Sequence, residues 1–312
     1  MSNIKNIQDK IDGFAQMLAQ YEAILAQDPT NFSNQISVNS FKAQISELER
    51  ELQFEKAKRD KEIIEIRLIG RSANGTLPLE ILAKLADGFS GAIINASNFI
   101  QFGNKKSKSN SQFINNAVDL RLAGISTGST RLFVTAKNSP DLFGKSLSEE
   151  SLNHSFNLLQ SNTPEELTES ASKIGKESVK KLNKFITAIS NADLEVDLNW
   201  TTPTNEKMEW KGDKTTLLKV AQSLSSIVMS EPEKIAFTGK LVGISLRGTF
   251  EIKTEDNKNI KGTYSKDLLE IAKTLTIDSS YTGEFEKKVI INSATGSEQT
   301  FYSLISIKSI KK

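Results

Sequence analysis

The sequence predicts an α+β protein in three parts: an N-terminal helical hairpin of the coiled-coil type, a central, mainly antiparallel sheet with helices, and a small C-terminal β-barrel. In residues 1–61 apolar side chains recur every three or four positions, and in residues 62–231 strands alternate with helices. Residues 232–312 show strand patterns almost throughout. A chain of 312 residues is long enough for such a division.

The first part is predicted to be two antiparallel helices with heptad seams. Asp28-Pro29 ends the first helix, and Ser40 is a candidate cap for the second. The seam residues, which are also our candidates for oligomerisation, are Ile4, Ile7, Ile11, Phe14, Leu18, Tyr21 and Leu25, followed by Phe41, Ile45, Leu48 and Leu52. The hairpin can pack on its own chain, or it can project and pair with a second copy or a partner protein. Both arrangements stay open at this point.

The central part alternates strand and helix signals in the order strand, helix, hairpin, two helices, hairpin, helix. That order is typical of helices laid on a mainly antiparallel sheet. Between the first helix and the first hairpin, residues 103–111 are predicted to be a flexible basic loop. Its Lys105, Lys106 and Lys108 can contact phosphate, although such loops are more often simple connections.

The third part contains three strands, a helix and two strands within about eighty residues. This order predicts an OB-like barrel, with an SH3-like barrel as the competing interpretation. Adjacent Phe301 and Tyr302 must point to opposite faces of their strand, and Tyr302 is the candidate for stacking on a nucleic-acid base.

Composition excludes much of enzymology. The chain has no Cys and one His, so thiolate chemistry and multi-His metal sites are not expected. The single His154 lies on the flank of a predicted helix, and the sequence has no nucleotide-binding glycine loop. We expect no cofactor and no bound metal, a cytoplasmic location, and no membrane segment, because apolar runs are only a few residues long.

One set of carboxylates offers an enzymatic alternative. Glu195 and Asp197 stand two apart on a predicted strand and, with Asp119 and a neighbouring Lys211, have the residue types of a metal-dependent nuclease or phosphodiesterase. Acids that alternate with Leu and Val are also typical of the solvated face of a half-buried strand. The choice between a metal site and a solvated strand face depends on whether the three carboxylates lie close together.

A second set is basic. Lys173, Lys176, Lys180 and Lys184 recur at helical spacing and form a stripe that can follow a phosphate backbone. Glu165, Glu166 and Glu169 precede them, and acids first with lysines last is also the order that stabilises a helix dipole. The net charge of +2 gives no general attraction to polyanions, so any nucleic acid must be met by a local patch.

The strings LAGISTGSTRLFVTA (122–136) and FTGKLVGISLRGTFEIKTEDNKNIKG (237–262) resemble uncharacterised bacterial proteins that join an α+β region to a small C-terminal barrel. The resemblance covers about residues 62–310. Such proteins are often encoded near phage-defence and mobile-element genes, so the resemblance implies a role in phage–host conflict. It carries over no functional residue.

The sequence therefore favours a non-enzymatic protein. In this hypothesis the hairpin assembles copies or recruits a partner, and the barrel recognises a ligand, with DNA or RNA as the candidates. The nuclease built on Asp119, Glu195 and Asp197 is the alternative.

Overall fold

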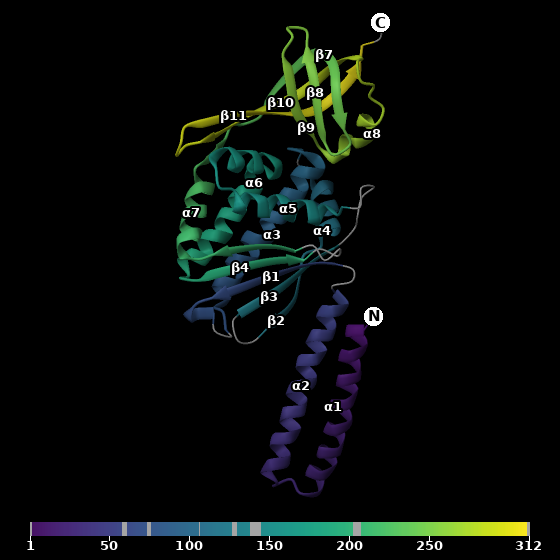
Figure 1. The fold of residues 1–312 in the computed structure, drawn as a ribbon, viewed down its shortest axis with the longest axis vertical. Helices are drawn as coiled ribbons and strands as arrows, with labels where there is room; N and C mark the ends of the chain where they lie inside the picture. The colour runs from purple at the N-terminus through teal and green to yellow at the C-terminus, as the bar shows by residue number, and fades with distance from the viewer. Residues whose placement is uncertain are drawn as a thin grey trace.

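The computed structural model describes residues 2–57, 61–73, 76–105, 107–126, 130–137, 145–201 and 207–310. It confirms the α+β class: a two-helix hairpin, an antiparallel sheet covered by helices, and a β-barrel follow one another along the chain (Figure 1). The helical layer lies between the sheet and the barrel, and the hairpin extends from the opposite side (Figure 1). No described helix combines the length and the apolar character needed to cross a lipid bilayer.

The hairpin consists of α1 (Ser2–Gln27) and α2 (Phe32–Ala57). The cap predicted at Ser40 is wrong, because Ser40 lies inside α2. Asn31 takes this role instead: its side-chain oxygen accepts a hydrogen bond from the backbone N–H of Asn34 at 3.1 Å, so the helix starts directly after the Asp28-Pro29 turn.

The two seams of the hairpin close on each other. Ile7, Ile11 and Leu52 are buried, and the ring of Phe41 lies 6.1 Å from that of Phe14 and 5.4 Å from that of Tyr21. Leu18, Leu25, Ile45 and Leu48 are half-buried. Ile4 lies in α1, but its side chain is outside the described part. The hairpin projects from the body, and α2 contacts the edge strand β2 (Arg121–Ser126).

The central sheet has the order β2-β3-β1-β4-β5, with every neighbouring pair antiparallel. Side chains on one face of β1, such as Ile64 and Leu68, are fully buried against the helices. The remaining strands are β1 (Lys61–Ile69), β3 (Thr130–Lys137), β4 (Glu195–Thr201) and β5 (Lys207–Gly212). The helices are η1 (Arg71–Ala73), α3 (Leu79–Phe102), α4 (Lys108–Val118), α5 (Leu147–Gln160), α6 (Pro164–Asn191) and α7 (Lys214–Ser225).

The flexible loop predicted over residues 103–111 is wrong from Lys108 onward, where α4 begins. The hydroxyl of Ser107 accepts a hydrogen bond from the backbone N–H of Asn110 and caps the helix. Ile114 and Val118 anchor α4 because both are fully buried in the central core.

Helix α6 is kinked at Gly175, whose φ of 76° and ψ of 164° are not helical. The cause is a close approach: a Cβ at this position would stand 2.8 Å from the ring of Phe99 on α3. Only glycine combines this positive φ with such contact. The kink separates the first half of α6 from the second.

The barrel is closed by five strands in the order β7-β8-β9-β11-β10, with β10 returning to β7. Its pairs are antiparallel except β9 with β11, which is parallel and only two residues long. A five-stranded barrel of this kind with a helix between its third and fourth strands has the OB-like arrangement. Its elements are β7 (Glu233–Ser245), β8 (Thr249–Thr254), β9 (Asn259–Tyr264), η2 (Lys266–Leu268), α8 (Leu269–Ala272), β10 (Ser280–Asn292) and β11 (Ser297–Ser309).

The far ends of β10 and β11 leave the barrel and pack on the body (Figure 1). There, β10 pairs with the short strand β6 (Ile227–Met229), and Ile290 and Met229 are buried in the central core. Phe301 of β11 packs against the same core. The barrel core around Phe285 is separate, so β10 carries residues of both cores.

Candidate functional site

A cavity of about 640 Å³ lies where the barrel meets the helical body. The body contributes the end of α3, one face of α5 and Lys173 of α6. The barrel contributes the β7–β8 loop around Arg247, the end of β9, the start of η2 and the middle of β11. Both parts are needed to form the walls, and pockets at such junctions are frequent ligand sites.

The charged groups of the cavity are mainly cationic. Six lysine or arginine residues face three glutamates: Lys105, Lys145, Lys173, Lys234, Arg247 and Lys266 against Glu149, Glu150 and Glu286. Lys105, Lys173 and Lys266 form ion pairs of 2.6–2.8 Å with acidic residues. Within the described part of the chain, the side chains of Lys234 and Arg247 have no acidic partner. The cavity therefore has uncompensated positive charge on its barrel side.

The only histidine, His154, lines this cavity beside Asn153. Burial lowers the pKa of His154, and the positive charges of Lys173, Lys145 and Lys266 act in the same direction against Glu150. The imidazole is therefore neutral at pH 7, with one nitrogen to donate and one to accept a hydrogen bond. Together with the Asn153 amide it offers hydrogen-bonding groups of both kinds to a ligand.

Apolar groups complete the walls. Phe99 and Phe102 of α3 face Leu246, Leu269 and Leu304 of the barrel across the cavity. The loop that carries Leu246 and Arg247 is held in place because the Tyr264 hydroxyl donates a 2.6 Å hydrogen bond to the carbonyl of Ser245. Aromatic rings and cations in one cavity suit a ligand with both a flat apolar part and anionic groups.

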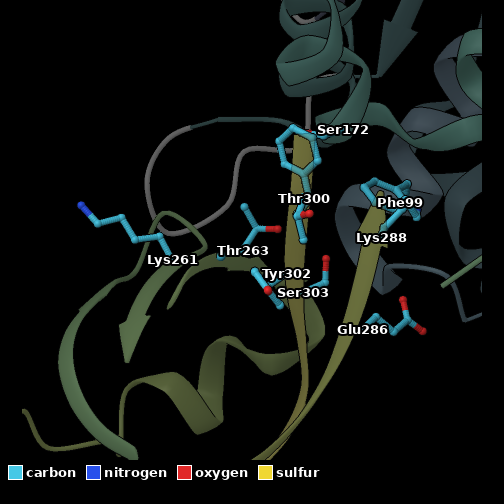
Figure 2. Close-up of a pocket in the computed structure, with 11 residues that line it drawn as sticks. Phe99, Ser172, Lys261, Thr263, Glu286, Lys288, Thr300, Tyr302 and Ser303 are labelled. Carbon is cyan, nitrogen blue, oxygen red and sulfur yellow. The ribbon is translucent and has the colours of Figure 1, made fainter. Parts of the chain in front are cut away.

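A second pocket of about 70 Å³ adjoins the cavity and shares Phe99, Thr263, Glu286 and Ser303 with it (Figure 2). It lies where β11 separates from β9, beyond their short parallel pairing. The ammonium of Lys288 stands 5.1 Å from the centre of the Phe99 ring at this pocket. We call it the small pocket below.

The structure does not place the four lysines of α6 on one continuous stripe. The kink at Gly175 directs Lys173 to the cavity, whereas the other three lie on the second half of the helix. Lys176 pairs with Glu231 at 2.9 Å, Lys180 pairs with Glu177 at 3.4 Å, and Lys184 is exposed.

The remaining basic and aromatic candidates also lie at different places in the structure. Lys105 lines the cavity and pairs with Asp267, and Lys106 lies outside the described residues. Tyr302 lines the small pocket and is half-buried against the barrel core, while Phe301 points to the body. The two rings lie on opposite faces, and Tyr302, the candidate for stacking on a base, is partly exposed.

The carboxylates of the nuclease alternative are engaged elsewhere. Asp119 accepts two hydrogen bonds from the guanidinium of Arg121, at 2.9 and 3.0 Å. Asp197 pairs with Arg67 at 3.4 Å and stands in register with Lys211, the lysine that the sequence placed next to it.

Sheet register also separates these carboxylates. Through β3, Arg121 at the start of β2 lies level with Ile63 of β1, whereas Glu195 lies opposite Ile69. Six residues of strand amount to about 20 Å, so Asp119 lies at the other end of the sheet from Glu195. The described residues contain no group of three acidic or histidine side chains able to hold a metal ion.

Comparisons with protein-family models, with curated proteins and with solved structures find no match to this chain. The functional interpretation of the cavity therefore depends on its geometry alone. Sequence reasoning missed Lys234, Arg247 and Lys288, because isolated cations on strands and turns carry no periodic signal.

Proposed function

We propose that this is a non-enzymatic binding protein whose barrel and body together hold a segment of single-stranded nucleic acid. The observation that supports this most directly is the cavity between them, which Lys234, Arg247 and the ring of Phe99 line together. Cations neutralise phosphates, and aromatic faces accept unpaired bases without regard to sequence.

The site supports binding better than catalysis. Asp119 is about 20 Å along the sheet from Glu195, so these carboxylates do not converge on one substrate atom. His154 is neutral and lies within the binding cavity, with no nucleophile hydrogen-bonded to it in the described part of the chain. We therefore assign His154 to ligand contact.

Fluorescence anisotropy with labelled ten-nucleotide single strands of DNA and RNA tests the proposal. We expect binding at 50 mM salt that weakens about sevenfold at 200 mM when two phosphates are neutralised. The double variant Lys234→Glu, Arg247→Glu should lose at least about tenfold in affinity. Lys253→Glu is the matched control, because Lys253 is an exposed barrel cation that lines neither pocket. Equal losses in both variants, or no binding by the unaltered protein, would contradict the proposal.

We further propose that the hairpin pairs with the hairpin of a second copy. Its outer half is apolar and nearly uncharged: Met17, Ile24, Phe32 and Ile36 are 48–72 % exposed, and residues 13–41 contain only two charged side chains. Interface cores are depleted of charge, and such a surface does not repel its own copy.

Light scattering over a concentration series tests this pairing. The unaltered protein should approach the dimer mass as its concentration rises, and Phe32→Ser with Ile36→Ser should shift it to the monomer. Val242→Ser is the control, because it removes an exposed apolar side chain from the barrel. A monomer mass at every concentration would refute pairing between copies.

A further inference from the structure

We infer that the small pocket is a phosphate site, which binds the terminal phosphate of a nucleotide whose base and sugar occupy the adjoining cavity. This inference rests on the proposed function and specifies its ligand as a phosphorylated nucleotide. The juxtaposition that supports it is an ammonium group, a cluster of hydroxyls and a shared opening into the cavity (Figure 2).

Lys288 supplies the charge. Its side chain is half-buried, and its ammonium has the ring of Phe99 as a neighbour but no carboxylate in ion-pair contact among the described residues. Cation–π contact compensates only part of the cost of taking an ammonium out of water. Burial accordingly lowers the pKa of Lys288, which identifies a cation without a full counter-charge.

The nearest carboxylates are already bound to other groups. Glu286 accepts a hydrogen bond from the amide of Asn104, and Glu231 pairs with Lys176 at 2.9 Å. They lie close enough to favour the charged form of Lys288 without making a direct contact with it. An anionic ligand in the pocket therefore has a cation available to it.

Hydroxyl groups lie on the same side of the ribbon as this ammonium. Ser172, Thr263 and Ser303 line the pocket there, and each hydroxyl can donate one hydrogen bond to an oxyanion. Thr300 and Tyr302 also line the pocket, but from the opposite face of β11. The pocket volume of about 70 Å³ exceeds several-fold the roughly 10–15 Å³ that one water requires. A tetrahedral oxyanion fits this space.

The shared residues fix where the rest of the ligand goes. Phe99 and Ser303 face both spaces, so a group bound beside Lys288 continues directly into the cavity. There a base meets Phe102 and the hydrogen-bonding groups of Asn153 and His154. The ring of Phe301, which also lines the small pocket, packs on the body core. In this proposal the terminal phosphate of the ligand lies beside Lys288.

Anisotropy competition with five probes tests this assignment: the ten-nucleotide strand with a 5′-phosphate, with a 3′-phosphate and with hydroxyls at both ends, and adenosine monophosphate against adenosine. We expect one phosphorylated strand to bind about tenfold tighter than the hydroxyl-ended strand, as a hydrogen-bonded charge provides. Tighter binding of the monophosphate alone identifies a free nucleotide as the ligand. Equal binding of phosphorylated and unphosphorylated probes refutes the phosphate site.

Two variants locate the effect. Lys288→Gln should abolish the preference for phosphate while hydroxyl-ended strands bind as before. Lys287→Gln is the matched control, because this neighbouring lysine points to the other side of β10, pairs with Glu233 and lines neither pocket. If strands bind but Lys288→Gln keeps the preference, the small pocket is wrong and the proposed function stands. If no strand binds but the monophosphate does, the phosphate site stands and single-strand binding is wrong.

Discussion

The hairpin and the barrel are attached to the same body in opposite ways. The apolar cluster of the hairpin around Ile7 and Leu52 is separate from the central core, and α2 contacts the body beside β2. The barrel instead extends β10 and β11 into the body, so that Ile290 belongs to the central core while Phe285 of the same strand belongs to the barrel core.

This difference explains where a binding site can form. A shared strand fixes the barrel against the helices, and ion pairs such as Lys266–Glu150 and Lys105–Asp267 add to the contact around the cavity. The hairpin shares no strand with the body, and its exposed outer half is suited to contacts with other molecules. The predictions below test whether the junction between barrel and body is rigid and whether the hairpin unfolds independently of the body.

Ile290→Ala should have the largest effect, because it removes a fully buried side chain from the strand that joins the two cores. We expect a loss of about 2–5 kcal/mol in the free energy of unfolding. Both tryptophans lie in the central sheet, so tryptophan fluorescence in a urea titration reports on the body. An unchanged midpoint would show that the barrel is attached more loosely than the structure indicates.

Glu62→Gln should alter how stability depends on pH. Glu62 has no solvent exposure and accepts hydrogen bonds from Trp200 and Ser146, and its burial raises its pKa to about 7. The folded state thus holds the proton more tightly than the unfolded state, so the contribution of Glu62 to stability is fully present below pH 4.5 and is lost as pH rises through 7. This pKa shift corresponds to about 3 kcal/mol of stability that is lost when Glu62 ionises. The variant cannot ionise at this position and should not show that loss.

Urea titrations of both proteins at pH 5 and pH 8 measure this difference. The variant and the unaltered protein should be closest at pH 5, and the variant should be the more stable at pH 8. Parallel pH dependence in the two proteins would mean that Glu62 is not the group responsible.

Gly175→Ala should cost about 1–3 kcal/mol, because the new Cβ meets the ring of Phe99 in a backbone conformation that alanine rarely adopts. The same change moves Lys173 and Phe99, which line the cavity. Affinity for the single strand should therefore fall along with stability. If the variant loses stability but keeps full affinity for the single strand, the kink at Gly175 is not needed to form the binding site.

Ile11→Ala should have the smallest effect on the body. It removes a buried side chain from the hairpin core, so helical circular dichroism should be lost at lower temperature. Tryptophan fluorescence of the body should keep its midpoint, because none of the hairpin side chains that the structure describes belongs to the central core. A matching shift of both signals would show that the hairpin is coupled to the body after all.

Periodicity predicted most of the elements, since it identifies which face of a helix or strand is buried. The hairpin seam follows from this periodicity, and so does the succession of three strands, a helix and two strands along the barrel sequence. The start of α2 and the helix α4 were missed because capping by Asn31 and Ser107 decided them, and Asn and Ser are as common in loops as in caps.

The site was less accessible to sequence reasoning. Lys173 was singled out as part of a basic stripe, and its separation from Lys176 depends on a contact between Gly175 and Phe99, residues 76 positions apart. Asp119 and Glu195 were grouped by residue type, and only strand order places them at opposite ends of the sheet. Local patterns do not specify which distant element lies across a cavity.

The turn between α1 and α2 makes the hairpin a natural spacer. Asp28, Pro29 and Thr30 are exposed at its tip, and each helix of 26 residues is about 39 Å long. A domain or fluorescent label inserted at Pro29–Thr30 would be displayed at about that distance from the body, on the side opposite the barrel (Figure 1), in a segment whose ends already lie close together. The tip of the hairpin thereby offers a place to tether the protein to a surface without contact to either pocket.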